Sequence, residues 1–120
     1  IDNLPSAMGF IRSGKLKAIG VTSTEPVKGL ESAPPIADFL PGYSAESWFV
    51  LMAPAGTPQA IVDQLSREVD SLLKEPETRT RLDSLGAVPV GGTPKQLADF
   101  IAAETTKWQK VVKDSGAKID

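Results

Sequence analysis

The most apolar stretch of the sequence runs from Trp48 to Ala53 and contains no charged or polar side chain apart from the indole N–H. It lacks the alternation of polar and apolar residues found in a strand with one solvated face, and is typical of a central strand covered on both faces. Pro54 and Gly56 end the run, because both residues favour a turn over a continuing strand. The run is too short to cross a bilayer and therefore predicts a buried strand.

Helical patterns alternate with apolar runs along the rest of the chain. Further strands are predicted at 16–21 and 88–90. Amphipathic helices are predicted at four places, which begin after Asn3, at Pro58, at Pro76 and at Pro94. The proline-rich stretch 25–42 leaves room for a single helical turn, around 36–39. This alternation predicts the α/β fold class, with a largely parallel sheet and flanking helices.

The ends of the helices carry recognisable capping residues. Thr93 and Gln96 have the spacing of a capping box, and Gly116 is placed to end the helix that they open. Thr57 is predicted to cap the helix that starts at Pro58. Asn3 is predicted to cap the first helix in the same way.

The composition excludes most enzymatic sites. The 120 residues contain no His and no Cys, so the chain cannot form a Ser/His/Asp triad, a thiol nucleophile, a disulfide or a zinc site of the common kind, and no cofactor is implied. A net charge of -2 supplies no field that would attract a nucleic acid backbone. The length is that of one modest domain.

Two charged or glycine-rich motifs have a plain structural interpretation beside a functional one. Gly91-Gly92-Thr93 before a helix could hold a phosphate, but a P-loop ending is missing and a turn with a cap is the preferred interpretation. Glu75, Glu77, Arg79 and Arg81 could form an acid/base cluster, but mixed charges on a helix are normally solvated.

Glu104 falls in the middle of an otherwise apolar helical stripe. We predict that its carboxylate is at least partly buried and is hydrogen-bonded to backbone N–H groups or paired with an arginine, which is a structural role. Trp108 lies on the same face and is predicted to belong to the core.

Polar residues at the ends of predicted strands are the candidates for ligand binding. Ligands of open α/β sheets gather beyond the carboxyl ends of the strands. In this chain that position is occupied by Asp2, Asn3, Thr22 and Ser23. Each of the four can equally be explained as a turn or cap residue.

A set of short strings in a fixed order identifies a family resemblance. The strings are Asp2-Asn3-Leu4-Pro5-Ser6, Gly14-Lys15-Leu16-Lys17-Ala18, Val21-Thr22-Ser23, Pro41-Gly42-Tyr43, Ser47-Trp48-Phe49, Ala53-Pro54-Ala55-Gly56-Thr57-Pro58, Leu85-Gly86-Ala87 and Gly91-Gly92-Thr93-Pro94. Glu104 and Trp108 match the same family's carboxyl-terminal helix. Together they make the chain resemble the solute receptors of tripartite tricarboxylate transporters, the Bug-type periplasmic substrate-binding proteins.

The resemblance implies a two-lobed fold like that of type II periplasmic binding proteins, of which this chain would be a carboxyl-terminal fragment. Residues 1–44 would finish the second lobe, and 45–120 would supply the strand that crosses the hinge and the end of the first lobe. The crossing strand adds Ser47 and Trp48 to the candidate ligand-binding residues, although packing in the core is the simpler explanation of Trp48.

The function implied is capture of a small organic acid, such as a di- or tricarboxylate, in the periplasm and its delivery to the membrane subunits of a transporter, without enzymatic chemistry. The alternative is a small regulatory or protein-interaction domain that retains no ligand. A hydrolase or transferase would need a Ser/Lys or carboxylate site that the sequence does not reveal. An uncovered apolar flank around Trp48 to Met52 also predicts a homodimer or a segment-swapped oligomer of the chain.

Overall fold

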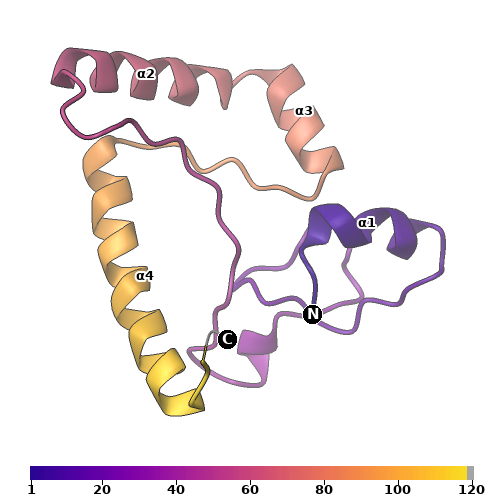
Figure 1. The fold of residues 1–120 in the computed structure, drawn as a ribbon. Helices are drawn as coiled ribbons and strands as arrows, with labels where there is room; N and C mark the ends of the chain where they lie inside the picture. Colours follow the sequence, from indigo (N-terminus) through magenta and orange to yellow (C-terminus); the bar gives the residue numbers. More distant parts are fainter. Residues whose placement is uncertain (119–120) are drawn as a thin grey trace. The chain divides into compact units, whose positions relative to one another are not determined.

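The computed structural model describes residues 1–118 as helices joined by long segments without regular structure (Figure 1). In chain order the elements are α1 (Leu4–Arg12), the 3-10 helix η1 (Ile36–Asp38), α2 (Gln59–Leu72), α3 (Pro76–Ser84) and α4 (Pro94–Ser115). The chain divides into two compact units. The first unit contains Ile1–Met52 and Lys74–Pro89, and the second contains Ala53–Leu73 and the chain from Val90 onward.

The predicted α/β fold with a largely parallel sheet is wrong for the described residues. The strand-type pairing found in them is an isolated parallel bridge between Val21 and Pro35. In it, the Val21 N–H donates to the Pro34 carbonyl at 3.0 Å and the Ile36 N–H donates to the Val21 carbonyl at 2.9 Å. The predicted strands at 16–21, 48–53 and 88–90 are otherwise irregular.

The physical reason is that a strand cannot complete its own hydrogen bonds. A helix closes its backbone hydrogen bonds within the segment, whereas a strand needs a neighbouring segment at its edge. The apolar runs have the side chains of covered strands, but within residues 1–118 no segment forms a ladder beside them. The sequence pattern therefore predicts that these runs suit a covered strand, but in the described residues they lack the neighbouring strand that would make them one.

The predicted helices are confirmed. Helix α1 places Leu4, Met8 and Ile11 on one face, as its spacing predicts, and Met8 is buried. Helix α3 begins at Pro76, where the missing N–H costs the helix nothing. The single turn expected around 36–39 is the 3-10 helix η1.

Helix α4 has the end groups that the sequence predicts. The Thr93 hydroxyl accepts from the Gln96 N–H at 3.2 Å, and the Gln96 side chain accepts from the Thr93 N–H at 2.8 Å. Gly116 follows the helix with a φ of 67°, the left-handed conformation that glycine adopts without strain. Helix α2 starts later than predicted, at Gln59, because the Thr57 hydroxyl donates to the Pro54 carbonyl at 2.9 Å and does not cap the helix.

The glycine after α3 brings that helix against the start of α1 within the first unit. Gly86 has a φ of 72°, and its N–H donates to the Asp83 carbonyl at 3.0 Å. A Cβ built on Gly86 would lie 2.7 Å from Cγ of Leu4, which is closer than two carbon atoms can approach. Position 86 therefore requires glycine for two reasons. The backbone has a positive φ angle, and the side chain of Leu4 leaves no space for a Cβ atom.

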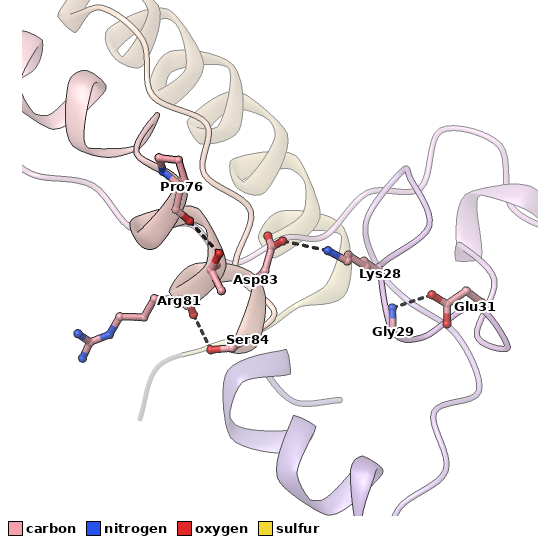
Figure 2. Close-up of polar contacts among 8 residues, drawn as sticks. Lys28, Gly29, Glu31, Pro76, Arg81, Asp83 and Ser84 are labelled. Atoms are coloured by element: carbon pink, nitrogen blue, oxygen red, sulfur yellow. Dashed lines mark hydrogen bonds and ion pairs between the residues drawn. The ribbon is translucent and has the colours of Figure 1, made fainter.

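The first unit has a small core with charged contacts around it. Its buried residues are Met8, Leu30, Ala33 and Pro35. Figure 2 shows Lys28 reaching Asp83 of α3, with 3.2 Å between Nζ and Oδ2. Both side chains are largely exposed, so this ion pair contributes little to stability.

Glu31 is held by the backbone of its own turn and gives the first unit a pH-dependent contact. Its carboxylate accepts from the Gly29 N–H at 2.8 Å (Figure 2). This bond, followed by one from the Glu31 N–H, lowers the pKa of Glu31 below its ordinary value of 4.5.

We therefore expect Glu31→Gln to remove an acid-sensitive part of the stability. Because the pKa is lowered on folding, the stabilisation is present above pH 4.5 and is lost as the pH falls through the folded-state pKa. Urea unfolding of the chain and of the variant at a series of pH values is the measurement. The chain should be the more stable of the two at pH 7, and the difference should disappear in acid. A difference that does not change with pH would contradict the assignment.

The apolar run predicted to be buried is exposed in the structure. Phe49 is 86% exposed, and the other members of the run are also accessible. We call Trp48, Phe49, Val50, Leu51 and Met52 the exposed apolar segment. Figure 1 shows this part of the chain, in magenta, as a drawn-out line without regular structure. Among the described residues, no helix is both long enough and apolar enough to cross a membrane.

Candidate ligand-binding site

Two of the predicted ligand-binding residues are in direct contact. The Ser47 hydroxyl donates to the side-chain oxygen of Asn3 at 2.6 Å, across 44 residues of sequence. Asn3 was predicted to cap α1, and this is wrong, because its side chain makes no hydrogen bond to the helix. Its backbone carbonyl instead accepts from the N–H groups of Ser6 and Ala7 at 3.1 and 3.2 Å. The Asn3–Ser47 pair therefore lies at the amino-terminal end of α1.

A third segment of the first unit approaches the same place. The Thr22 carbonyl accepts from the Ala45 N–H at 3.1 Å, two residues before Ser47. Thr22 is half-buried, whereas Asn3 and Ser47 are exposed. The structure thus brings the start of α1, the chain around residue 22 and the chain around residues 45–47 into one neighbourhood.

The other predicted residues make local contacts. The Asp2 carboxylate accepts from the Asn3 N–H at 2.8 Å, and the Ser23 hydroxyl donates to the Glu25 carbonyl at 2.8 Å. These contacts fit the explanation of Asp2 and Ser23 as turn residues. Trp48 is 40% exposed, so its assignment to the core does not hold for this chain. For all six residues a role in ligand binding stays a prediction.

The Asn3–Ser47 pair provides uncharged hydrogen-bonding groups. The Asn3 amide has two N–H donors, and its oxygen is already satisfied by the Ser47 hydroxyl, which fixes the direction of the amide. The hydroxyl of Thr22 is a further donor in the same part of the unit. Donors of this kind can orient a small polar ligand such as a carboxylate, and neither Asn3 nor Ser47 could supply acid/base or nucleophilic chemistry without an activating partner.

The second unit contains a hollow of which the sequence analysis singled out the glycine loop and the capping box but not the residues of α2. It measures about 300 Å³ and is lined by Ser66, Arg67 and Asp70 of α2 together with Gly92, Thr93 and Gln96. The Ser66 hydroxyl donates to the Gly92 carbonyl at 3.3 Å. The signal in the sequence is the spacing of residues 66, 67 and 70, which places three polar side chains on one face of α2.

The polar groups of this hollow bind one another. The Gly92 N–H donates to the Asp70 carboxylate at 3.3 Å, and the Thr93 N–H is satisfied by Gln96. A Cβ on Gly91 would lie 2.6 Å from the Asp70 carboxylate, so the loop needs glycine in order to pass so close. Asp70 also repels any anion near these donors. The interpretation of Gly91-Gly92-Thr93 as a turn and cap is confirmed.

The charged residues of α3 lie on its surface. Glu75, Glu77, Arg79 and Arg81 are exposed, and Figure 2 shows the Arg81 guanidinium pointing away from Asp83 and Lys28. Exposed charges of this kind are solvated and are poor candidates for acid/base catalysis. In the described part of the chain, no cluster of acidic side chains is placed to hold a metal ion.

Comparison with known proteins shows which family the chain belongs to. The model of the tripartite tricarboxylate transporter family receptor matches residues 1–117. The chain belongs to this receptor family. The match extends over both compact units and includes the Asn3–Ser47 pair, the exposed apolar segment and all of α4.

Several curated members of the receptor family are similar to the chain. Protein BugT of Bordetella pertussis is 35% identical over 120 residues, which cover 99% of this chain and 37% of BugT. A UPF0065 protein from the tcbD-tcbE intergenic region of a Pseudomonas species is 35% identical over 114 residues, covering 93% of this chain and 34% of the relative. A UPF0065 protein from the clcB-clcD intergenic region of Pseudomonas knackmussii is 32% identical, covering 93% of this chain and 68% of the relative.

The chain therefore spans about a third of the length of the first two relatives and about two thirds of the third. The predicted division at residue 44 concerns the lobes of a whole receptor, and it stays a prediction beside the two compact units seen here. The predicted self-association of the chain also stays a prediction.

Within the region matched by the receptor family, Glu104 makes the contacts of a structural residue. Its side chain is 15% exposed, pairs with the Lys107 ammonium and accepts from the Trp108 indole N–H at 2.9 Å. The Lys107 ammonium also lies 5.4 Å from the centre of the Trp108 ring. The prediction of a partly buried, hydrogen-bonded Glu104 is confirmed, but the partners found are a lysine and an indole of α4, where backbone N–H groups or an arginine were predicted. Trp108 is 38% exposed, so its predicted place in the core is wrong for the described chain.

We expect Glu104→Ala to destabilise the chain by about 1–2 kcal/mol, because the substitution leaves the Trp108 indole and the half-buried Lys107 without their acceptor. The matched control is Asp99→Ala on the same helix, since Asp99 is 66% exposed in its ion pair with Lys95. The control should cost under about 0.5 kcal/mol. Urea unfolding of both variants is the measurement, and equal losses would show that Glu104 is an ordinary surface residue.

Proposed function

We propose that the chain is part of an extracytoplasmic solute-binding receptor that captures a small organic acid and presents it to a tripartite transporter. The match of the receptor family to residues 1–117 is the observation that carries the proposal. The absence of His and Cys agrees with a protein that binds its ligand and does not catalyse a reaction on it. A di- or tricarboxylate is the ligand class, the periplasm is the compartment, and the membrane subunits of the transporter are the partners.

The polar neighbourhood of the first unit is the proposed contribution of this chain to ligand binding. Asn3, Ser47 and Thr22 supply hydrogen bonds, and their convergence from three segments supports their choice. Asp2, Ser23 and Trp48 complete the proposed set. Residues 1–44 and 45–120 belong to different lobes in this proposal, and the Thr22–Ala45 hydrogen bond lies where the two parts of the chain meet.

The test is a receptor in which this chain replaces its aligned counterpart. In BugT the aligned region covers 37% of the protein and can be exchanged for the 120 residues described here. The exchanged protein and BugT are titrated by calorimetry with a panel of di- and tricarboxylates, and with the corresponding amides as neutral controls. We expect binding of at least one acid with a Kd of about 1 μM, equivalent to about 8 kcal/mol.

Variants of the exchanged protein examine the proposed residues. Asn3→Ala and Ser47→Ala should each weaken binding about tenfold, the loss expected for one hydrogen bond to a charged ligand. Ser66→Ala in the second unit is the control, because its hydroxyl bonds to a loop carbonyl at 3.3 Å and lies outside the proposed set. A folded exchanged protein that binds no acid, or that binds one with unchanged affinity in the Asn3 and Ser47 variants, contradicts the proposal for this chain.

A further inference from the structure

The hollow of the second unit contains two groups of hydrogen-bond donors that the fold does not use. The Gln96 side chain accepts through its oxygen from the Thr93 N–H at 2.8 Å and from the Thr93 hydroxyl at 3.0 Å. Its amide nitrogen makes no hydrogen bond to a described residue. The Arg67 guanidinium also lines the hollow, and within the described chain it has neither a hydrogen bond nor an ion pair. Paired N–H donors of this kind suit the two oxygens of a carboxylate.

The fold fixes the direction of the Gln96 amide before any ligand is present. Because the capping box holds the oxygen of this amide, the nitrogen has one orientation and needs no reordering on binding. Gln96 and Arg67 are both exposed, so a molecule from solvent can reach them. The two donor groups therefore form an accessible and partly preorganised contact for a carboxylate.

A carboxylate of the protein lies in the same hollow. Asp70 is half-buried, and its Oδ1 accepts from the Gly92 N–H at 3.3 Å. Gly91 and Gly92 have φ angles of 69° and 112°, and this backbone path brings the loop against Asp70. A carboxylate can accept several hydrogen bonds, so Asp70 can also accept from a ligand.

The positive and the negative group of the hollow lie one helical turn apart on α2. Side chains three positions apart on a helix are neighbours, with about 5–6 Å between their Cβ atoms. A simple anion near this pair is repelled by Asp70, and a simple cation is repelled by Arg67. A molecule that carries both charges meets an opposite charge at each of its ends.

We propose that this hollow binds a small zwitterion with an ammonium and a carboxylate group, such as a free α-amino acid. Arg67 and the Gln96 amide nitrogen hold the carboxylate, and Asp70 accepts from the ammonium. The volume of about 300 Å³ is at the lower end of the range found for small-molecule sites. The inference is independent of the proposed function, because the hollow belongs wholly to the second unit and the Asn3–Ser47 pair to the first.

The experiment is a titration of the full 120-residue chain with L-serine, followed by the NMR signals of the backbone amides. We expect the amides of residues 66–70, 92 and 93 to shift with a Kd of about 1 mM, a weak affinity because the contacts stay partly in water. L-Serinamide lacks the carboxylate and N-acetyl-L-serine lacks the ammonium. Each should bind at least about tenfold more weakly than L-serine, because one charged contact is lost.

Variants that retain the contacts of the fold examine each group. Arg67→Ala removes the guanidinium, and Gln96→Glu retains an oxygen for the capping box but replaces the amide nitrogen, so each should weaken L-serine binding about tenfold or more. Asp70→Asn retains an acceptor for the Gly92 N–H and removes the charge, so it should reverse the preference for L-serine over N-acetyl-L-serine. Arg81→Ala is the control, because Arg81 is an exposed arginine of the first unit, and it should leave the affinity unchanged.

Each outcome of the titration has a defined meaning. Binding of L-serine that requires Arg67, the Gln96 amide and the charge of Asp70 supports the inference. No shift of the hollow's amides at about 20 mM L-serine, or an affinity unchanged by Arg67→Ala, overturns it. Equal binding of N-acetyl-L-serine assigns the hollow to anions and overturns it as well. Shifts confined to the amides around Asn3 and Ser47 place the binding in the first unit and also overturn it.

Discussion

Gly86→Ala is expected to destabilise the first unit by about 2–4 kcal/mol. About 1 kcal/mol comes from forcing alanine into the left-handed conformation at a φ of 72°. The rest comes from the new methyl group, which would lie 2.7 Å from Cγ of Leu4 and must push α1 away from the end of α3. Urea unfolding followed by circular dichroism is the measurement.

Gly14→Ala is a closely matched control for this substitution. Gly14 follows the nine-residue helix α1 as Gly86 follows the nine-residue helix α3, and its φ of 73° is nearly the same. No atom lies within 4 Å of a Cβ built on Gly14. The control should therefore lose only the conformational part, about 1 kcal/mol. Equal losses for the two variants would mean that Leu4 moves aside without cost.

The isolated chain is expected to bind di- and tricarboxylates with a Kd of about 1 mM or weaker. This is at least about 1,000-fold weaker than the binding expected of the exchanged protein, in which the chain replaces the aligned region of BugT. Asn3 and Ser47 are exposed on one side of the first unit, so a ligand held there alone keeps most of its surface in water. Too few oriented donors would remain to offset the loss of ligand and side-chain freedom on binding.

Calorimetry of the 120-residue chain with the same panel of acids makes this measurement, and the exchanged BugT protein serves as the positive control. A Kd near 1 μM for the isolated chain, about 8 kcal/mol, would show that the complete site lies within these residues. In that case the contacts between Asn3, Ser47 and Thr22 would be sufficient by themselves, and no second lobe would be needed.

The sequence predicts the helices well because their determinants are local. Pro76 and the box of Thr93 and Gln96 set the starts of α3 and α4, and Gly116 sets the end of α4, all within a few residues of the helix. Even the error at the start of α2 has a local cause: the Thr57 hydroxyl donates to a carbonyl that precedes it, and α2 begins one residue later than predicted, at Gln59.

The strands and the Asn3–Ser47 pair were beyond local prediction. A strand depends on a neighbour that can lie anywhere in the chain or outside it, so the run from Trp48 to Ala53 could be recognised as apolar without revealing what covers it. Asn3 and Ser47 were both singled out, but their contact spans 44 residues, and no short-range pattern predicts that Ser47 takes the oxygen expected to cap α1.

Helix α4 has a further consequence for the order in which the chain folds. Its capping box, its terminal glycine and its i,i+4 ion pairs Lys95–Asp99 and Lys110–Asp114 all lie within or directly beside the helix. A helix with these local contacts forms in about a microsecond. The contact between Asn3 and Ser47 must wait until a loop of 44 residues has closed. The last helix of the chain therefore has its determinants within itself, whereas the polar neighbourhood of the first unit depends on residues far apart in the sequence.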